Sequence, residues 1–313
     1  MTLDILVCHH DEPLDYVRRF LSSVDSQDDL GGVRVVICND GSEVPVTYDM
    51  IEGHGCEVQY IESARGGLSH TRNVLLDEAD ADYLMLCDID DHFLDEGSVG
   101  RLKALCDGCD VVQTDFVRRY GDGTWDILPH DVSLVHGKAF RRGFITENGI
   151  RFADDLVMAS DGYFLTQASL LSGRTVTSNE PLYVWEQREG SVSHRDRDFM
   201  VVNHWYAVEA NGLLAERFSD RRDLHGMFVA RLVHGSYLRM HSDRWAAHAE
   251  EFGCRFAVRT LAWWLKRYYQ EYASLPEGGR RHRYEVALAS SGLGDPGFDG
   301  IGEWARGVME GVT

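Results

Sequence analysis

The sequence predicts an α/β fold, a mainly parallel sheet with helices on both faces, followed by a helical region. Short apolar runs alternate with segments of helical periodicity through the first 120 residues. After about residue 200 the periodicity is helical throughout. The charge changes at the same place, because residues 1–200 hold 17 Lys and Arg against 37 Asp and Glu, whereas residues 201–313 hold 14 of each. We therefore predict two domains, residues 1–200 and 201–313.

The first half of the chain contains five runs that predict buried strands, since each is short, apolar and bounded by turn residues. These runs are Leu3–Cys8, Val33–Cys38, Val58–Ile61, Tyr83–Cys87 and Asp110–Tyr120. Apolar residues recur at helical spacing between them, in Leu14–Val24, Leu68–Leu76 and Leu102–Cys106. Strands separated by helices pair mainly in parallel, which puts a layer of helices on each face of the sheet.

Beyond residue 120 the pattern is less regular. The Gly121-Asp122-Gly123 turn predicts a hairpin to a strand at 124–128. Helices are expected at 140–148 and 161–171, and short strands at 174–177 and 182–185. The second domain is expected to hold four amphipathic helices, then a Gly-rich loop at 292–302 and a short last helix. These four are Phe199–Arg217, Asp223–His241, Trp245–Tyr272 and Arg281–Ala289.

Composition narrows the class of protein. The formal net charge of −20 opposes binding to DNA or to anionic lipid unless it is neutralised locally. No stretch of about 18 apolar residues predicts a membrane-spanning helix, and the first residues lack the basic region of a signal peptide. Seven cysteines, an odd number, are typical of reduced thiols, and the isolated Cys106-x-x-Cys109 is a weak metal or redox signal. A cytoplasmic location is therefore expected.

Polar clusters follow three of the predicted strands, at 9–12 (HHDE), 39–42 (NDGS) and 88–91 (DIDD). The carboxyl ends of parallel strands meet at one edge of the sheet, where ligands bind. Asp88 and Asp90 are two residues apart, so in extended chain they face the same side. Such a pair suits Mg²⁺ or Mn²⁺, which combine one or two protein carboxylates with substrate phosphate oxygens. The alternative is a solvent-exposed acidic loop.

These segments resemble the family 2 glycosyltransferases of the GT-A fold over roughly residues 3–195. Residues 35–42 (VVICNDGS) are similar to the family's strand-Asp-Asp-Gly-Ser element, with Asn39 in place of the first Asp. Residues 66–73 (GGLSHTRN) resemble its Arg-Asn helix start, and residues 84–91 (LMLCDIDD) its D-x-D strand. The acceptor-side segments are similar at 136–142 (HGKAFRR), 148–152 (NGIRF) and 154–161. The family's Pro-x-Tyr-Asn after the first strand is absent.

The resemblance implies a site for a nucleotide-sugar donor. Asp11 and Asp40 would contact its base and ribose, and Asp88 would face the ribose or the metal. Arg72 would steady these carboxylates or the diphosphate by charge-assisted hydrogen bonds. A purely structural ion pair is the alternative role for Arg72.

The resemblance also implies a metal and a general base. Asp90 would bind Mn²⁺ or Mg²⁺ directly, and His194 would supply a last ligand, unless it is an exposed loop histidine. Asp161 stands at the catalytic position, although Ser160 replaces the Glu that usually precedes it. A carboxylate there can accept the acceptor's hydroxyl proton, or it can simply cap the helix. Asp154 and Asp155 are the rival bases. The roles of four other residues stay open: His9, His10, Lys138 and Arg188.

The predicted function is inverting, metal-dependent transfer from a nucleoside-diphosphate sugar, a UDP-sugar by family base rates, to a hydroxyl of a glycan or glycolipid. The aromatic and arginine residues of the second domain suit either a large or anionic acceptor or an ordinary helix core. Three alternatives are an enzyme acting on modified nucleic acid, a sugar-nucleotide pyrophosphorylase, and a non-catalytic nucleotide-sugar-binding protein. Salt-sensitive binding to DNA would identify the first alternative. The second usually has a Gly-rich turn after the first strand, which is missing here. Hydrolysis of the donor by the purified protein would exclude the third.

Overall fold

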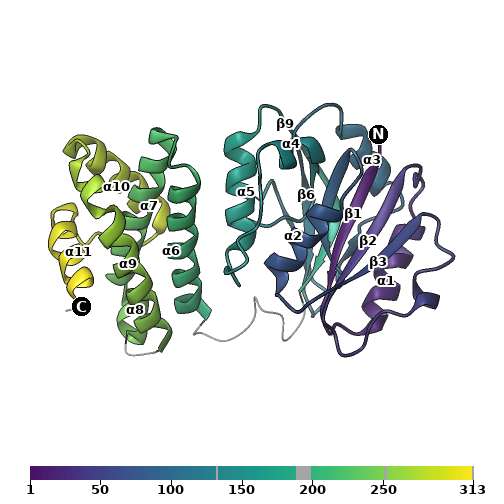
Figure 1. Cartoon of the computed structure of the whole chain (residues 1–313), viewed down its shortest axis with the longest axis horizontal. Helices are drawn as coiled ribbons and strands as arrows, with labels where there is room; N and C mark the ends of the chain where they lie inside the picture. Colours follow the sequence, from purple (N-terminus) through teal and green to yellow (C-terminus); the bar gives the residue numbers. More distant parts are fainter. Residues whose placement is uncertain (132, 188–198, 250–251, 312–313) are drawn as a thin grey trace. The chain divides into compact units, whose positions relative to one another are not determined.

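The structure, a computed structural model, describes residues 1–131, 133–187, 199–249 and 252–311. The chain divides into two compact units, Met1–Ser191 and Val192–Thr313. The first holds a sheet with its covering helices, and the second consists of helices (Figure 1). The domain boundary predicted after residue 200 falls within the first turn of helix α6, and the independence of the two domains stays a prediction.

Nine strands of the described chain form one mixed sheet in the order β3-β2-β1-β4-β8-β6-β9-β5, with β7 paired to β6. The first four strands are parallel: β1 (Leu3–His9), β2 (Val33–Asp40), β3 (Glu57–Ser63) and β4 (Tyr83–Asp88). The others are β5 (His92–Phe93), β6 (Val111–Arg119), β7 (Trp125–Leu128), β8 (Lys138–Arg141) and β9 (Thr175–Glu186). Because β8 runs antiparallel to both β4 and β6, it joins the parallel part to the rest.

The sheet separates two apolar layers, because successive side chains of a strand point to opposite faces. Ile5 and Val7 belong to one buried cluster and Leu6 belongs to the other. The first cluster is completed by α1 (Leu14–Asp25) and α3 (Ser98–Leu105). The second is completed by α2 (Leu68–Glu78), α4 (Arg142–Glu147) and α5 (Ser160–Leu171). The prediction of helices on both faces is confirmed.

Two segments of this unit differ from the sequence prediction. The helix expected at 140–148 begins only at Arg142, because Phe140 pairs with Leu84 of β4 and Val111 of β6 as part of β8. Four residues are too few for a strand to show its period of two. The two short strands expected at 174–177 and 182–185 are one strand, β9, whose pairing with β6 shifts register near Asp115.

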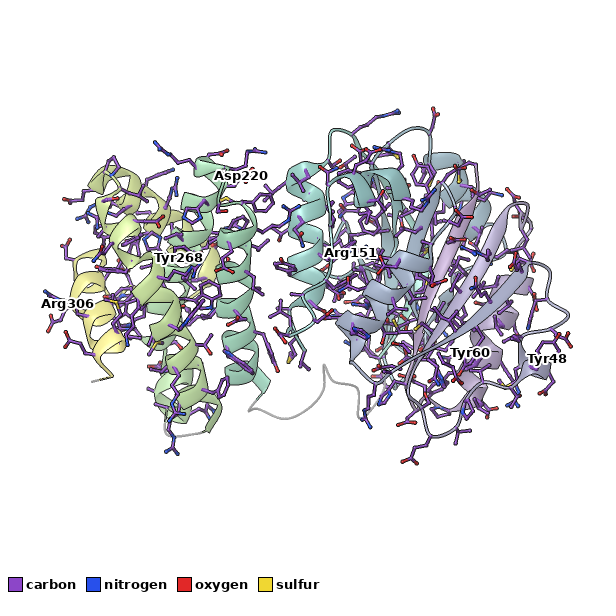
Figure 2. All side chains as sticks on the ribbon, in the orientation of Figure 1. Tyr48, Tyr60, Arg151, Asp220, Tyr268 and Arg306 are labelled. Atoms are coloured by element: carbon purple, nitrogen blue, oxygen red, sulfur yellow. The ribbon has the colours of Figure 1, made fainter. Side chains whose placement is uncertain are left out.

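The second unit contains α6 (Phe199–Arg217), α7 (Arg222–Met240), α8 (Asp243–His248), α9 (Phe252–Ser274), α10 (Glu277–Ser291) and α11 (Ile301–Glu310). The prediction of a single helix over 245–272 is wrong, because α8 ends at His248 and α9 begins at Phe252. The predicted Gly-rich loop is shorter than expected, because a 3₁₀ turn at Phe298–Gly300 leads into α11. Tyr268 points into the interior of the unit, whereas Arg306 is exposed on α11 (Figure 2).

Among the helices that the structure describes, none has the length and apolar character needed to cross a membrane. None of the seven cysteines, all of them in the described ranges, forms a disulfide, and Cys106 and Cys109 are buried. The C-x-x-C pair is therefore part of the packed interior of the first unit.

The packing of α6 against α9 generates a prediction. Gly212 of α6 lies against the indole of Trp264, so an added methyl group would overlap the ring. The indole is buried and its Nε1 donates to Glu209 at 3.1 Å, which limits its movement. Gly212→Ala should therefore lower the free energy of unfolding by about 1–3 kcal/mol in urea titrations, the usual cost of overpacking, although alanine is the better helix former.

Gly235 of α7 is the matched control, because an added methyl group there has no atom within 4 Å. Gly235→Ala should raise the free energy of unfolding by about 0.5–1 kcal/mol through helix propensity alone. Stabilisation of equal size in both variants would contradict the close packing of α6 on Trp264.

Candidate active site

Three strand ends lie side by side at the carboxyl edge of the parallel strands. Cys8, near the end of β1, pairs with Cys38 of β2 and with Asp88 of β4. The residues that follow Cys8, Cys38 and Asp88 in the chain therefore leave the sheet next to one another. This register brings the turn after β1, the end of β2 and the end of β4 to a common edge, as the pattern of polar clusters predicted.

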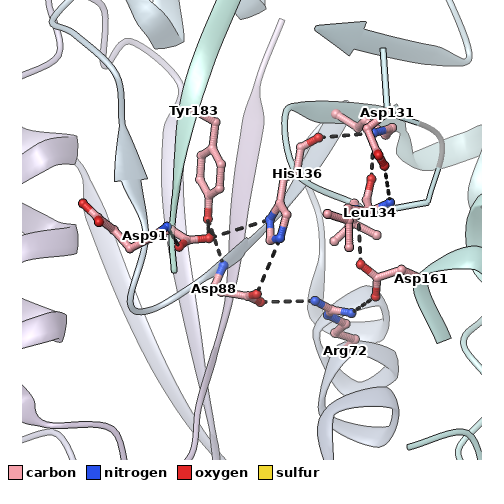
Figure 3. A network of polar contacts seen from close by, with 11 residues as sticks. Arg72, Asp88, Asp91, Asp131, Leu134, His136, Asp161 and Tyr183 are labelled. Atoms are coloured by element: carbon pink, nitrogen blue, oxygen red, sulfur yellow. Dashed lines mark hydrogen bonds and ion pairs between the residues drawn. The ribbon is translucent and has the colours of Figure 1, made fainter. Parts of the chain in front are cut away.

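A buried guanidinium connects two of the predicted site carboxylates. Arg72, near the start of α2, donates from Nη2 to Asp88 Oδ1 at 3.1 Å and from Nη1 to Asp161 Oδ1 at 2.5 Å (Figure 3). Its side chain is 3% exposed. Burial by itself lowers the pKa of Arg72, but Asp161 and Asp88 outweigh burial and hold that pKa above its usual range. The guanidinium is thus a fixed positive charge between the end of β4 and the first turn of α5.

The acidic turn after β4 has a buried inner side. Asp91 is fully buried, and it accepts from the Tyr183 hydroxyl at 2.8 Å and from the Glu186 N–H at 2.9 Å. The same hydroxyl accepts the Asp88 N–H at 3.1 Å. Burial raises the pKa of Asp91 well above its usual range, and the charges of Asp88 and Asp90 act in the same direction. Asp91 therefore ties the turn to β9 and fixes the backbone of Asp88.

His136 stands between the two ends of this turn. Its Nε2 lies 4.0 Å from Asp88 Oδ2 and its Nδ1 lies 3.7 Å from Asp91 Oδ2 (Figure 3). The ring stacks on Tyr183 at 5.5 Å between centroids, and Nδ1 is buried without a hydrogen-bond partner. Burial lowers the pKa of His136 below its ordinary value, which favours the neutral imidazole.

The loop that carries His136 is fixed from inside by a buried lysine. Lys138 is 2% exposed, and its Nζ donates to the carbonyls of Leu134 at 2.7 Å and of His136 at 3.3 Å. Gly137 has a φ of 65°, and a Cβ there would approach Thr114 Oγ1 to 3.0 Å. The loop in turn presents the Val135 N–H, which donates to Asp161 Oδ2 at 3.1 Å. Both oxygens of Asp161 are thereby oriented.

The polar residues after β1 and β2 hold each other in place. Both oxygens of Asp40 accept backbone N–H groups, from Gly66 at 2.7 Å and from Gly67 at 2.9 Å. Asp40 therefore fixes the turn that leads into α2 and Arg72. Asp11 has a left-handed φ of 57°, and its Oδ1 accepts the Glu43 N–H at 2.7 Å. The predicted contacts of Asp11 and Asp40 with a nucleotide stay predictions.

The same turn accounts for the two histidines whose roles were open. His9 is buried and its ring nitrogens contact Glu12 O at 3.1 Å and Ser42 Oγ at 3.3 Å. His10 Nδ1 contacts Asp40 O at 2.9 Å. These rings serve the conformation of the turn rather than an open site.

The rival bases lie in the loop before α5. Asn73, next to Arg72, donates from Nδ2 to Asp154 Oδ1 at 2.8 Å and to the Phe152 carbonyl at 3.0 Å. Asp155 is exposed, as is Asp154. Ala159 has a left-handed φ of 60° just before α5, an unusual conformation for alanine that sets the direction in which Asp161 enters the site. Asp161 is thus the carboxylate of this region that pairs with Arg72.

The donor set at this edge fits a hard divalent cation, which prefers oxygen ligands with some imidazole nitrogen. Within the described ranges, Asp88, Asp91 and His136 offer ligand atoms that all lie within 4.8 Å of one another. Both carboxylate oxygens of Asp91 accept hydrogen bonds from within the protein. The partly exposed carboxylates of Asp88 and Asp90 are therefore better suited to a cation that is shared with a ligand. Asp90 is outside the three-residue cluster, and His194 and Arg188 lie outside the described residues, so their roles stay predictions.

Sequence reasoning did not assign a role to three members of this site: His136, Tyr183 and the Val135 N–H. The sequence His136-Gly137-Lys138 lies in a segment that resembles the family. Its glycine is the residue that could have indicated a tightly constrained loop at this position. Tyr183 had no signal, because an apolar strand such as Leu182–Trp185 does not reveal which side chain reaches a distant carboxylate.

Comparisons with known proteins agree with this geometry. The sequence pattern described as Glycosyl transferase family 2 matches residues 4–172. The poly(ribitol-phosphate) beta-N-acetylglucosaminyltransferase TarS of Staphylococcus aureus strain Mu50 / ATCC 700699 is 26% identical over 230 residues, or 66% of this chain. The match in strain MW2 has the same extent. The chain spans 40% of the length of these curated relatives.

Two solved structures share the fold. The crystal structure of S. aureus TarS 1–349 in complex with UDP-GlcNAc superposes with a TM-score of 0.67 at 19% identity, covering 100% of this chain and 91% of that one. The complex of the same TarS fragment with UDP gives 0.64 at 17% identity with the same coverage. The predicted GT-A fold, with a helical region after it, is confirmed.

The buried lysine generates a pH-dependent prediction. Burial lowers the pKa of Lys138 from 10.5 to about 8. Between these values the unfolded chain keeps a proton that the folded chain has released, so the stability of the fold rises with pH relative to a variant without the amine. The unfolding free energy of the wild type minus that of Lys138→Met should therefore increase by up to about 1.4 kcal/mol per pH unit. Urea titrations at about pH 7, 8, 9 and 10 measure it, and a constant difference would contradict a buried amine.

Proposed function

The chain belongs to glycosyl transferase family 2, and on this premise we propose that it is an inverting, metal-dependent glycosyltransferase. The donor is a nucleoside-diphosphate sugar, with a UDP-sugar as the first candidate, and the acceptor is a hydroxyl of a glycan, glycolipid or related polymer. The observation that carries the proposal is the Asp88–Arg72–Asp161 bridge. It joins a carboxylate on the donor side to the carboxylate at the catalytic position of the family.

Asp161 is the proposed general base. Its oxygens are oriented by Arg72 and by the Val135 N–H, and each carboxylate oxygen retains a second lone pair for an acceptor hydroxyl. Asp161 takes the hydroxyl proton as the oxygen attacks the anomeric carbon from the side opposite the leaving diphosphate. The ion pair with Arg72 holds the Asp161 carboxylate in place.

Asp88 and Asp90 are the residues proposed to hold the divalent cation, with His194 as a further candidate ligand. When bound, Mn²⁺ or Mg²⁺ supplies Lewis-acid stabilisation of the departing diphosphate. The chain itself contributes the rigid turn beneath it. Asp91 and Tyr183 fix that turn and with it the place of Asp88 beside Arg72.

The relatives suggest which substrates to test first. The curated relatives are named as transferring N-acetylglucosamine to poly(ribitol-phosphate), and a structure with the same fold holds UDP-GlcNAc. UDP-GlcNAc and a polyol-phosphate polymer are therefore the proposed first donor and acceptor for this chain. The lack of disulfide bonds among the seven cysteines is in keeping with a proposed cytoplasmic location.

Replacing the proposed base should separate binding from chemistry. Asp161→Asn keeps the shape of the side chain but removes the proton acceptor, so single-turnover transfer from UDP-GlcNAc should fall by about 10² to 10⁴. The affinity for UDP, measured by calorimetry, should change only a few-fold. Some stability is lost because Arg72 keeps only one carboxylate, so rates are compared below the unfolding transition of the variant.

Asp154→Asn is the matched control, since it alters an exposed carboxylate of the same loop that contacts Asn73 and not Arg72. Asp155→Asn is a second control. Both should retain transfer within a few-fold of wild type. If Asp161→Asn is active while either control is inactive, the base is misassigned.

The metal proposal has a readout that does not need transfer. UDP binding by the wild type should be strong in Mn²⁺ and weak in EDTA, because the diphosphate shares the cation with the protein. In Asp90→Asn the two affinities should become similar, while the thermal unfolding temperature without ligand stays close to that of wild type. Equal affinity of wild-type protein for UDP in Mn²⁺ and in EDTA would contradict metal dependence.

A further inference from the structure

The helical unit contains a groove whose lining includes none of the residues of the site at the sheet edge. It lies between α6, α7 and α10 and has a volume of about 800 Å³. Its apolar lining includes Ala207, Met227 and Ala230. Three arginines, Arg231, Arg239 and Arg283, also line it, and we call it the basic groove. All of its lining residues belong to the second unit.

One side of the basic groove is a straight row on α7. Arg231, Gly235 and Arg239 are spaced four residues apart, so they lie on the same face of the helix in successive turns. Gly235 opens the space between the two guanidinium groups, since nothing lies within 4 Å of the position of a Cβ there. At 1.5 Å rise per residue, the two arginines are about 12 Å apart along the helix.

The opposite side, on α10, supplies the third cation. Arg283 donates from Nη1 to the carbonyl of Gly226 on α7, at 2.6 Å. That bond uses one of five guanidinium N–H donors and anchors Arg283 beside the start of the row. Asp223 is the one acidic residue of the lining, and its carboxylate lies 3.8 Å from Arg221 Nε. The described lining thus has three arginines to one aspartate.

This concentration of positive charge stands out from the surrounding composition. Residues 201–313 carry equal numbers of acidic and basic side chains, and the whole chain has a net charge of −20. His234, which also lines the groove, is buried beside these cations. Burial first, then the charges of Arg283 and Arg280, lower the pKa of His234 to about 4.

We propose that the basic groove binds an anionic, phosphodiester-bearing chain, the acceptor polymer, on a different unit from the one that holds the site of transfer. This assignment rests on the proposed function for the identity of that chain as the acceptor. Guanidinium groups bind phosphate oxygens with paired N–H donors. Two arginines about 12 Å apart along one helix suit an extended ligand, because each can pair with a different phosphate of the chain. The apolar part of the lining suits the carbon backbone that joins successive phosphates.

A matched pair of substitutions at Gly235 tests the groove while every arginine stays in place. Gly235→Glu puts a carboxylate between the two arginines, and Gly235→Gln puts an uncharged side chain of the same length there. Gly278→Glu makes the same change of net charge at an exposed glycine of α10 outside the lining, where a Cβ also meets open space. The probe is fluorescently labelled poly(ribitol phosphate), and anisotropy with the full chain measures its affinity without donor.

Gly235→Glu should weaken binding at least about tenfold, while Gly235→Gln and Gly278→Glu stay within about threefold of wild type. Arg231→Gln combined with Arg239→Gln should reduce the slope of log affinity against log salt by about two, one for each arginine that no longer pairs with a phosphate. Arg217→Gln combined with Arg306→Gln, on exposed arginines outside the groove, is the control and should leave that slope unchanged. Wild-type affinity in Gly235→Glu overturns the groove, and equal losses in all three glycine variants overturn recognition by local charge.

Transfer assays with the same polymer separate this proposal from the proposed function. Gly235→Glu should raise the KM for polymer with kcat and UDP affinity unchanged. If polymer binds through the groove but no sugar is transferred, the groove stands and the proposed function fails. If sugar is transferred and the KM of Gly235→Glu equals that of wild type, the proposed function stands and the groove fails.

Discussion

The buried positive charge of Arg72 is the constraint on which the rest of the site depends. A guanidinium that is nearly excluded from water costs several kcal/mol unless carboxylates surround it, and Asp88 and Asp161 meet that requirement from β4 and α5. The same two ion pairs hold together segments that are far apart in sequence. Residues 72, 88 and 161 can contact one another only when α2, β4 and α5 are all in place. The site is therefore a product of the complete sheet and cannot form from any one motif.

The acidic turn after β4 shows how neighbouring carboxylates acquire different tasks. Asp88 faces Arg72 and remains partly exposed, whereas Asp91 is buried against Tyr183 and the β9 backbone. Burial raises the pKa of Asp91, which suits a structural hydrogen-bonding role better than that of a charged ligand. His136 completes the turn from a loop that Lys138 fixes internally. A series of polar contacts thus connects β9, through the acidic turn and the loop of His136, to the carboxylate of Asp161.

The two units divide the charge of the chain between them. The acidic first unit holds its carboxylates at a sheet edge, where a bound divalent cation would offset both their mutual repulsion and their repulsion of a diphosphate ligand. The second unit is neutral overall, and it gathers three arginines along one groove. The acidic excess of the chain and the arginine-lined groove thus belong to different units.

The sequence by itself determined the alternation of strands and helices, the helical character of the second unit and the family, because these depend on local periodicity and on short ordered motifs. It also predicted Asp88 and Asp161 as site residues. Only the tertiary structure decided that Arg72 bridges them, that Asp40 turns inward to Gly66 and Gly67, and that Asp91 is buried. It likewise revealed β8 and Tyr183, neither of which has a local signal. The physical reason is that burial and ion pairing are properties of the surroundings of a side chain, and those surroundings come from residues tens of positions away.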